Sequence, residues 1–166
     1  TFLLTFMDFR KKLTMKECAE KKYTHDELCE IAVRWLNRRT AIAVSEIRHG
    51  AEIPDAIGFC GYGTVLIECK TSRGDFLKDF KKGCRKSLGL GNYRYFMCPW
   101  GMVDAKELPP KWGLLWIKNG RVYLQSGARY YGHSNHEQWL FESDKQTEWG
   151  ILIQVARRLK EAFTEN

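Results

Sequence analysis

The hydrophobic pattern of the chain first becomes regular at residue 24. Thr24 is followed three residues later by Glu27, which is the spacing of a capping box at a helix start. Across residues 24–39, apolar side chains recur at the spacing of one helical face, at Leu28, Ile31, Ala32, Trp35 and Leu36. The pattern therefore predicts a helix that begins at Thr24 and buries this face.

Short apolar and β-branched runs follow this helix and predict strands. The second and third of them form a hairpin that turns through Gly61-Tyr62-Gly63, and Asn119-Gly120 is a strong turn signal between the last two. The predicted strands are residues 40–48, the two arms of the hairpin at 53–70, then 92–99, 113–118 and 121–125.

Two further helices are predicted, at residues 71–87 and 144–163. The first places Phe76, Leu77 and Phe80 on one side and basic residues mainly on the other. The second is amphipathic, with an inward face predicted to hold Trp149, Leu152, Ile153, Ala156 and Leu159. This order of elements predicts an α/β sandwich, in which helices flank a mixed central sheet.

Composition agrees with one domain that has a sizeable core, since the 166 residues are 44% hydrophobic and 13% aromatic. We assign the domain to residues 24–166. The charged residues 1–23 are interpreted as an accessory segment, either a helix or a poorly ordered arm. A net charge of +7 favours a polyanionic partner, without identifying it.

The six cysteines are scattered, with no Cys-x-x-Cys pair, and are interpreted as reduced thiols. The apolar start of the chain is too short for a secretory signal, and no apolar run approaches the roughly 20 residues of a membrane span. We therefore expect a cytoplasmic protein with no membrane partner.

Acidic residues mark one end of the predicted hairpin. Asp55 starts its first strand, and Glu68, Cys69 and Lys70 end its second. Because side chains alternate along a strand, Glu68 and Lys70 share one face while Cys69 takes the other. Two carboxylates offer the hard oxygen ligands that Mg²⁺ prefers, and a nearby lysine could orient water or stabilise charge during phosphodiester hydrolysis. The alternative is an ordinary hairpin with a surface Glu-Lys pair.

The motif Pro54-Asp55, followed by Glu68-Cys69-Lys70, resembles the core of the PD-(D/E)xK nuclease superfamily. The order of the flanking segments is similar to that of small MmcB-like and phage- or prophage-encoded nuclease-like proteins of this superfamily. The resemblance extends over roughly residues 24–123.

This resemblance implies a restriction-endonuclease-like fold and a DNA endonuclease that acts in phage DNA metabolism or DNA repair. Mg²⁺, with Mn²⁺ as a substitute, would be held by Asp55, Glu68 and the backbone carbonyl of Cys69, while Lys70 assists the nucleophile. In such nucleases an acid on the first helix often joins the metal site. Glu27 is the first candidate for that acid, with helix capping as its alternative role.

Glu30 and Glu52 remain open as the additional acid, and His25 is assigned to the turn that caps the helix. Basic residues after the hairpin could follow a phosphate backbone or form a solvated face. These are Lys78, Lys81, Lys82, Arg85 and Lys86.

Two other functions compete with the nuclease. One is a catalytically silent DNA-binding or repair-accessory module of the same fold, and the other is a protein-interaction subunit whose charge is incidental. Symmetric cutting of both DNA strands would require a homodimer, so the oligomeric state is left open.

Overall fold

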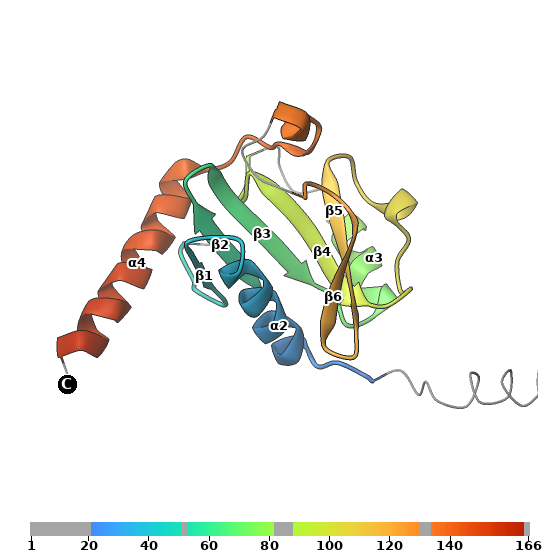
Figure 1. Ribbon diagram of the computed structural model, residues 1–166, viewed down its shortest axis with the longest axis horizontal. Coiled ribbons are helices and arrows are strands. Elements are labelled where there is room, and N and C mark those ends of the chain that lie inside the picture. The colour runs from blue at the N-terminus through green and yellow to red at the C-terminus, as the bar shows by residue number, and fades with distance from the viewer. Residues whose placement is uncertain (1–20, 51–52, 82–87, 130–133, 165–166) are drawn as a thin grey trace, which may run out of the picture.

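A computed structural model describes residues 21–50, 53–81, 88–129 and 134–164. Within them, six strands form one mixed sheet in which spatial order follows chain order (Figure 1). The pairs β3–β4 and β4–β5 are parallel, and the other neighbouring pairs are antiparallel. The strands are β1 (Ile42–Val44), β2 (Ala56–Cys60), β3 (Gly63–Cys69), β4 (Tyr93–Pro99), β5 (Trp112–Lys118) and β6 (Arg121–Ser126).

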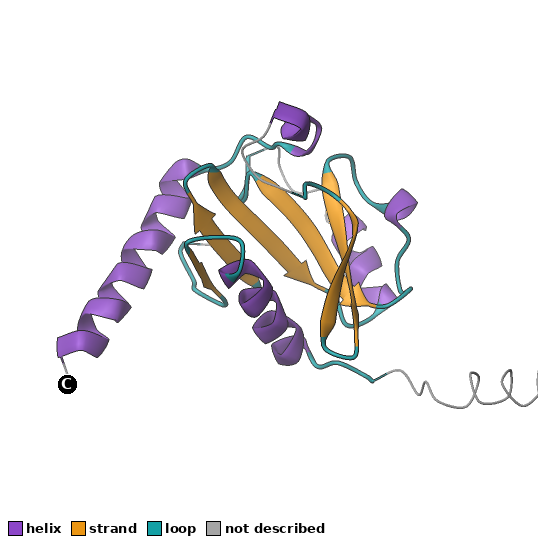
Figure 2. Ribbon diagram, in the orientation of Figure 1, coloured by secondary structure: helices purple, strands orange, loops and turns teal. Residues whose placement is uncertain are grey.

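Among the described residues, three α-helices flank this sheet (Figure 2), which confirms the predicted α/β sandwich around a mixed sheet. They are α2 (His25–Asn37), α3 (Arg73–Lys81) and α4 (Lys145–Thr164), accompanied by the short 3₁₀ helices η1 (Ala105–Glu107) and η2 (Ser134–Trp139). No helix in the described part of the chain is long and apolar enough to cross a membrane.

Helix α2 begins with the predicted capping box. The Thr24 hydroxyl accepts a hydrogen bond from the backbone N–H of Glu27, and the Glu27 carboxylate accepts one from the N–H of Thr24. The predicted apolar face is buried at all five positions. Local spacing alone was therefore sufficient to place this helix and its buried face.

The alternation of side chains along β3 and β4 divides the core between two sides of the sheet. Val65, Ile67 and Tyr95 pack with α2 on one side. Leu66 and Phe96 belong to the cluster on the other side, together with Phe76 of α3. The rings of Phe76 and Phe96 meet edge to face with centroids 5.2 Å apart.

Two predicted elements differ in length from the observed ones. β1 has three residues rather than nine, because Glu46 adopts a φ of 53° and this left-handed backbone ends the extended run. The helix predicted at residues 71–87 is observed as Arg73–Lys81. Residues 82–87 lie outside the described part of the chain.

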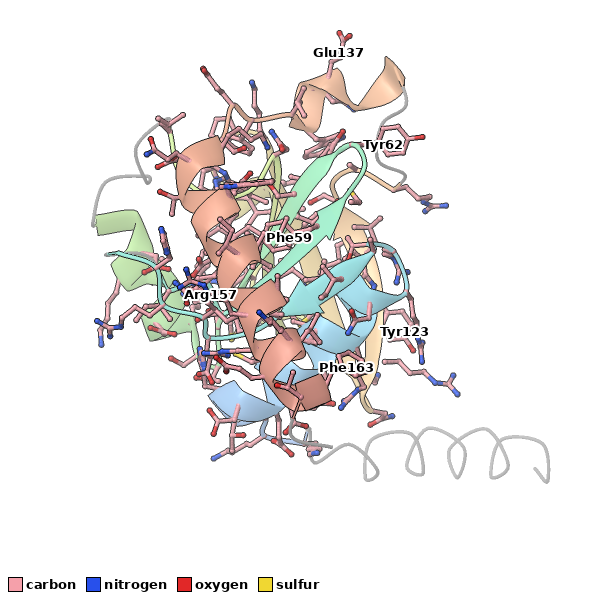
Figure 3. The ribbon with its side chains drawn as sticks, turned by 90° about the vertical axis from the view of Figure 1, so that its left-hand side faces the viewer. Phe59, Tyr62, Tyr123, Glu137, Arg157 and Phe163 are labelled. Atoms are coloured by element: carbon pink, nitrogen blue, oxygen red, sulfur yellow. The ribbon has the colours of Figure 1, made fainter. Side chains whose placement is uncertain are left out.

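The predicted inward face of α4 is wrong. Trp149 is 64% exposed and Leu159 47% exposed, whereas Ile151 and Val155 are buried. Figure 3 looks onto α4, where Phe163 lies near its C-terminal end and is also exposed. The helix therefore packs through a narrow stripe at its start, and most of its apolar residues face away from the core.

A buried acid explains this orientation of α4. Glu148 is 3% exposed, and its carboxylate accepts hydrogen bonds from the Thr64 hydroxyl and from the N–H of Gly91. The other oxygen of the carboxylate pairs with Lys145 at 2.9 Å. Because burying an unpaired carboxylate would be costly, these partners fix which side of α4 faces the sheet.

Candidate functional site

The structure brings Asp55 and Glu68 to the same end of two paired strands. Ala56 pairs with Ile67 in the antiparallel register of β2 and β3, so Asp55 lies just before that pair and Glu68 just after it. One oxygen of the Asp55 carboxylate accepts a hydrogen bond from the backbone N–H of Cys69 at 2.8 Å. Asp55 is thereby fixed beside the end of β3.

Lys70 follows β3 directly and continues its pairing with β4, since its backbone N–H donates to the carbonyl of Met97 at 2.9 Å. Its side chain is buried. The Lys70 Nζ lies 2.7 Å from Asp79 Oδ2 and 3.7 Å from Glu68 Oε2. Lys70 is thus held between two carboxylates, one from its own strand and one from α3.

These carboxylates decide the charge of Lys70. Burial alone would lower the pKa of Lys70, because desolvation disfavours the ammonium form. The hydrogen bond to Asp79 and the charges of Glu68, Asp79 and Asp55 outweigh burial and raise the pKa above 10.5, the usual value. Lys70 is therefore a cation at neutral pH.

Asp79 was missed from the sequence as a member of this group. It lies three residues after Phe76, so the two side chains share one face of α3, and Phe76 is the buried anchor of that helix. That spacing was a signal that Asp79 faces the sheet. The spacing did not identify Lys70 as the partner of Asp79, because that contact also depends on the path of the β3–α3 connection, which the sequence pattern does not define.

Two of the three acids considered as an additional ligand are described, and both have partners of their own. Both oxygens of Glu27 are engaged at the helix start, one by the N–H of Thr24 and the other by Lys21 at 2.9 Å. Glu30 is exposed and faces Arg34 across one helical turn. Glu52 lies outside the described residues.

The Asp55 carboxylate has a second protein partner, because its Oδ1 lies 3.2 Å from Nε2 of His25. His25 also approaches a thiol, with 3.4 Å between its Nδ1 and Sγ of Cys29. Contact with the Cys29 thiol and burial both raise the pKa of the Cys69 thiol. Cys69 is thus a neutral core thiol, and only its backbone carbonyl could serve as a hard ligand.

Two carboxylates are side-chain donors available to a cation at this end of the sheet. Asp55 and Glu68 are carboxylates on adjacent strand ends, and each carboxylate oxygen has more than one lone pair, so the hydrogen bonds to Asp55 do not exhaust its capacity as a ligand. Mg²⁺ typically binds one or two carboxylates and completes its shell with waters and phosphate oxygens. Asp55 and Glu68 thus offer the type of ligand atom that Mg²⁺ takes, but within the described residues they do not belong to a group of three or more closely spaced metal-ligating side chains.

A wide groove on the α2 side of the sheet was not predicted. It has a volume of about 1350 Å³ and runs between α2, the β2–β3 turn and the β5–β6 hairpin. Its wall includes the aromatic side chains Trp35, Tyr62 and Tyr123, the last two labelled in Figure 3. Five arginines line it, at positions 34, 38, 39, 121 and 129, and its described lining contains no acidic residue.

The predicted DNA-binding residues of the basic helix are described only in part. Lys78 is exposed on α3. Lys81 is the last residue of that helix, but its side chain lies outside what the structure describes, as do Lys82, Arg85 and Lys86. The arginines of the α2 groove are therefore the larger described cationic group, and the helix α2 that borders this groove lies on the opposite side of the sheet from α3 (Figure 1).

No family model matches the chain, and no curated protein matches its sequence. The fold is similar to that of the solved SPO1766 protein of unknown function from Silicibacter pomeroyi. The two chains are 20% identical over 84% of this chain and 92% of that chain, with a TM-score of 0.57. At this identity the likeness concerns the fold alone.

Proposed function

We propose that this protein is a metal-dependent nuclease with a restriction-endonuclease-like fold, which hydrolyses phosphodiester bonds in DNA. The observation that supports the proposal is that Asp55 and Glu68 stand at the same end of the paired strands β2 and β3, with Lys70 3.7 Å from Glu68. A mixed sheet with helices on both faces supports the fold assignment.

Asp55, Glu68 and the carbonyl of Cys69 would hold Mg²⁺ or Mn²⁺. When bound, such an ion lowers the pKa of a coordinated water and offsets phosphate charge. Lys70 places a positive charge 3.7 Å from the proposed ligand Glu68, where it can stabilise charge that develops on the phosphate. Asp79 holds the Lys70 ammonium in this position.

A second function has its own support, namely nucleic-acid binding without cleavage. The α2 groove combines five arginines with exposed Tyr62 and Tyr123, and arginines beside aromatic rings suit a single strand whose bases stack. The hydrogen bonds already made by Asp55 and Lys70 also suit a site with a purely structural role.

One experiment separates these functions. The purified protein is incubated with single-stranded, duplex, flapped and branched DNA in Mg²⁺, Mn²⁺ or EDTA, and both cleavage and binding are measured. The nuclease proposal expects cleavage that requires the metal and is lost in Glu68→Gln. Glu30→Gln is the matched control, because Glu30 is an exposed acid on α2 that faces Arg34.

The outcomes assign the function directly. Binding without cleavage under all metal conditions would replace the nuclease with the binding module. Neither binding nor cleavage would refute both and favour a protein-interaction subunit. If duplex DNA is cut symmetrically, sedimentation of the active species is expected to show a homodimer.

A further inference from the structure

Three residues of different chemistry meet beside the start of α2. His25 and Cys29 come from that helix, four residues apart, and Glu46 comes from the connection between β1 and β2. Their potential ligand atoms all lie within 4.8 Å of one another. Over the described residues, this is the one group of three or more His, Cys, Asp or Glu side chains that meets this condition.

The spacing of the first two ligands suits a metal ion. A separation of four residues puts two side chains on one face of a helix. His25 Nδ1 lies 3.4 Å from Cys29 Sγ. In a tetrahedral zinc site, with Zn–N of about 2.0–2.1 Å and Zn–S of about 2.3 Å, the nitrogen and the sulfur lie about 3.6 Å apart. The observed separation of these two atoms is slightly shorter than this, so the imidazole and the thiol need to move only slightly apart to hold the ion.

The other nitrogen of His25 is already oriented. Its Nε2 lies 3.2 Å from Asp55 Oδ1, while Asp55 is itself held by the N–H of Cys69. Histidines that bind metals through one ring nitrogen usually donate the other N–H to a carboxylate or carbonyl. This arrangement leaves Nδ1 of His25 directed toward Cys29 as the ligand atom.

The three side chains differ in how far they are buried. Cys29 is 3% exposed and lies at the floor of the cluster, whereas the side chain of His25 is 42% exposed and Glu46 is exposed. Glu46 is kept in place by its backbone N–H, which donates to the carbonyl of Pro54 at 3.0 Å. An ion can thus enter from solvent and reach a protected sulfur.

We propose that His25, Cys29 and Glu46 form a binding site for a zinc-type divalent transition-metal ion, with a fourth position left for water. A thiolate and an imidazole select such an ion over Mg²⁺, which prefers oxygen ligands. The site is distinct from the one proposed for Mg²⁺ and does not depend on nuclease activity. Asp55 connects the two sites, since it orients His25 in the first and is a proposed ligand in the second.

Cobalt provides a direct test, because Co²⁺ replaces Zn²⁺ and gives visible absorption together with a thiolate charge-transfer band. Tag-free, reduced protein is titrated with Co²⁺ and then with Zn²⁺. We expect one Co²⁺ per chain, a thiolate band, loss of the spectrum on addition of Zn²⁺, and no loss on addition of millimolar Mg²⁺. Cys29→Ser should abolish the thiolate band.

The control is Cys60→Ser, which removes a half-buried thiol at the end of β2 and should leave the band intact. Because Cys29 lies in the core, His25→Gln and Glu46→Gln provide a second test at exposed positions, and each should weaken Zn²⁺ binding at least ~10-fold. The proposal is overturned if the wild type gives no thiolate band, or if the band persists in folded Cys29→Ser. It is also overturned if the two exposed variants bind Zn²⁺ as tightly as the wild type.

Discussion

The Lys70 ammonium lies 2.7 Å from the Asp79 carboxylate and joins the end of the central strand β3 to helix α3. The side chains are 8% and 18% exposed, so neither charge is well hydrated in the folded protein. Removal of one partner leaves the other with a buried and poorly compensated charge. This pair therefore contributes to how α3 is held against the sheet.

We expect Asp79→Leu to lower the free energy of unfolding by about 3 kcal/mol, because it leaves Lys70 without its closest carboxylate. The double variant Lys70→Met, Asp79→Leu should regain part of that loss, since it removes both charges of the pair, but not all of it, because the buried Glu68 carboxylate then loses Lys70 as a partner. Urea unfolding of Asp79→Leu, of Lys70→Met alone and of the double variant measures both effects. If Asp79→Leu lowers the free energy of unfolding by less than ~1 kcal/mol, solvent screens the attraction between Lys70 and Asp79.

Lys70 also gives a test of chemistry against binding. In the nuclease proposal, Lys70→Ala removes the charge that stabilises the reacting phosphate but keeps Asp55 and Glu68. Single-turnover cleavage should fall by at least ~10²-fold while DNA affinity changes little. Asp55→Asn should impair the Mg²⁺ dependence of cleavage as well.

Lys106→Ala is the control, because Lys106 is an exposed lysine of η1. Circular dichroism establishes that each variant is folded before rates are compared. Equal cleavage rates in the wild type, Lys70→Ala and Asp55→Asn would remove these residues from the catalytic site.

The elements that the sequence predicted well are those defined by nearby residues. The capping box of Thr24 and Glu27, the apolar face of α2 and the hairpin that ends at Lys70 all depend on spacings of a few positions. The same alternation placed Asp55 and Glu68 at one end of the sheet. Such features are encoded locally, so periodicity and turn chemistry were sufficient.

The features that were missed depend on contacts between distant segments. Glu148 turns α4 through its bonds to Thr64 and Gly91, which are 84 and 57 positions away. The approach of Glu46 to His25, and the convergence of arginines from α2 and β6, likewise require the register of the whole sheet. Residue pattern alone does not carry that information.

Because of the orientation of α4, we expect substitutions at two nearby positions of this helix to have very different effects on the free energy of unfolding. Ile151→Ala should lower the free energy of unfolding by about 2–5 kcal/mol, because Ile151 is fully buried. Trp149→Ala should change it by no more than about 0.5 kcal/mol, since Trp149 is 64% exposed. Thermal and urea unfolding provide the measurement, and a larger loss in Trp149→Ala would show that this face is covered.

Gly150 of α4 lies too close to a neighbouring side chain to be replaced by a larger residue. A Cβ added at Gly150 would come within 2.1 Å of the His49 ring, whose Nδ1 also lies 2.9 Å from Gln154 Nε2. The start of α4 thus depends on a residue without a side chain. This contact fixes the helix against the connection that follows β1.

The start of α4 also predicts a pH dependence. Asp144 accepts hydrogen bonds from the hydroxyl and the N–H of Thr147, and these bonds lower its pKa below the usual 3.8. A lowered carboxylate pKa stabilises the folded state fully above the unfolded-state pKa, and this contribution is lost as pH falls through the folded-state pKa. Thr147→Val removes the hydroxyl donor. It should therefore destabilise the protein at neutral pH, by an amount that shrinks below about pH 4.

Unfolding of the wild type, Thr147→Val and Thr147→Ser over this pH range measures the difference. Thr147→Ser keeps the hydroxyl and should follow the wild type. A Thr147→Val penalty that is constant with pH would assign the loss to packing rather than to the Asp144 carboxylate.

DNA could follow either the arginines of the α2 groove or the lysines of the predicted basic helix, and the two possibilities lead to opposite predictions for the salt dependence of binding. Each phosphate contact contributes about −0.9 to the slope of log affinity against log salt for duplex DNA, and about −0.7 for single strands. Arg38 and Arg121 are exposed residues of the α2 groove, while Lys78 and Lys82 belong to the predicted basic helix. Each pair removes two positive charges when changed to alanine, so the two double variants are matched in charge.

If DNA follows the α2 groove, Arg38→Ala with Arg121→Ala should flatten the salt slope by roughly one to two units, whereas Lys78→Ala with Lys82→Ala should leave it unchanged. Tyr62→Ala should then weaken binding to a single strand by about 1–3 kcal/mol, because Tyr62 is 70% exposed and offers a stacking surface. The reverse result would place the phosphates along α3. Unchanged slopes in both double variants would show that neither surface contacts DNA, and the net positive charge of the chain would then need another explanation.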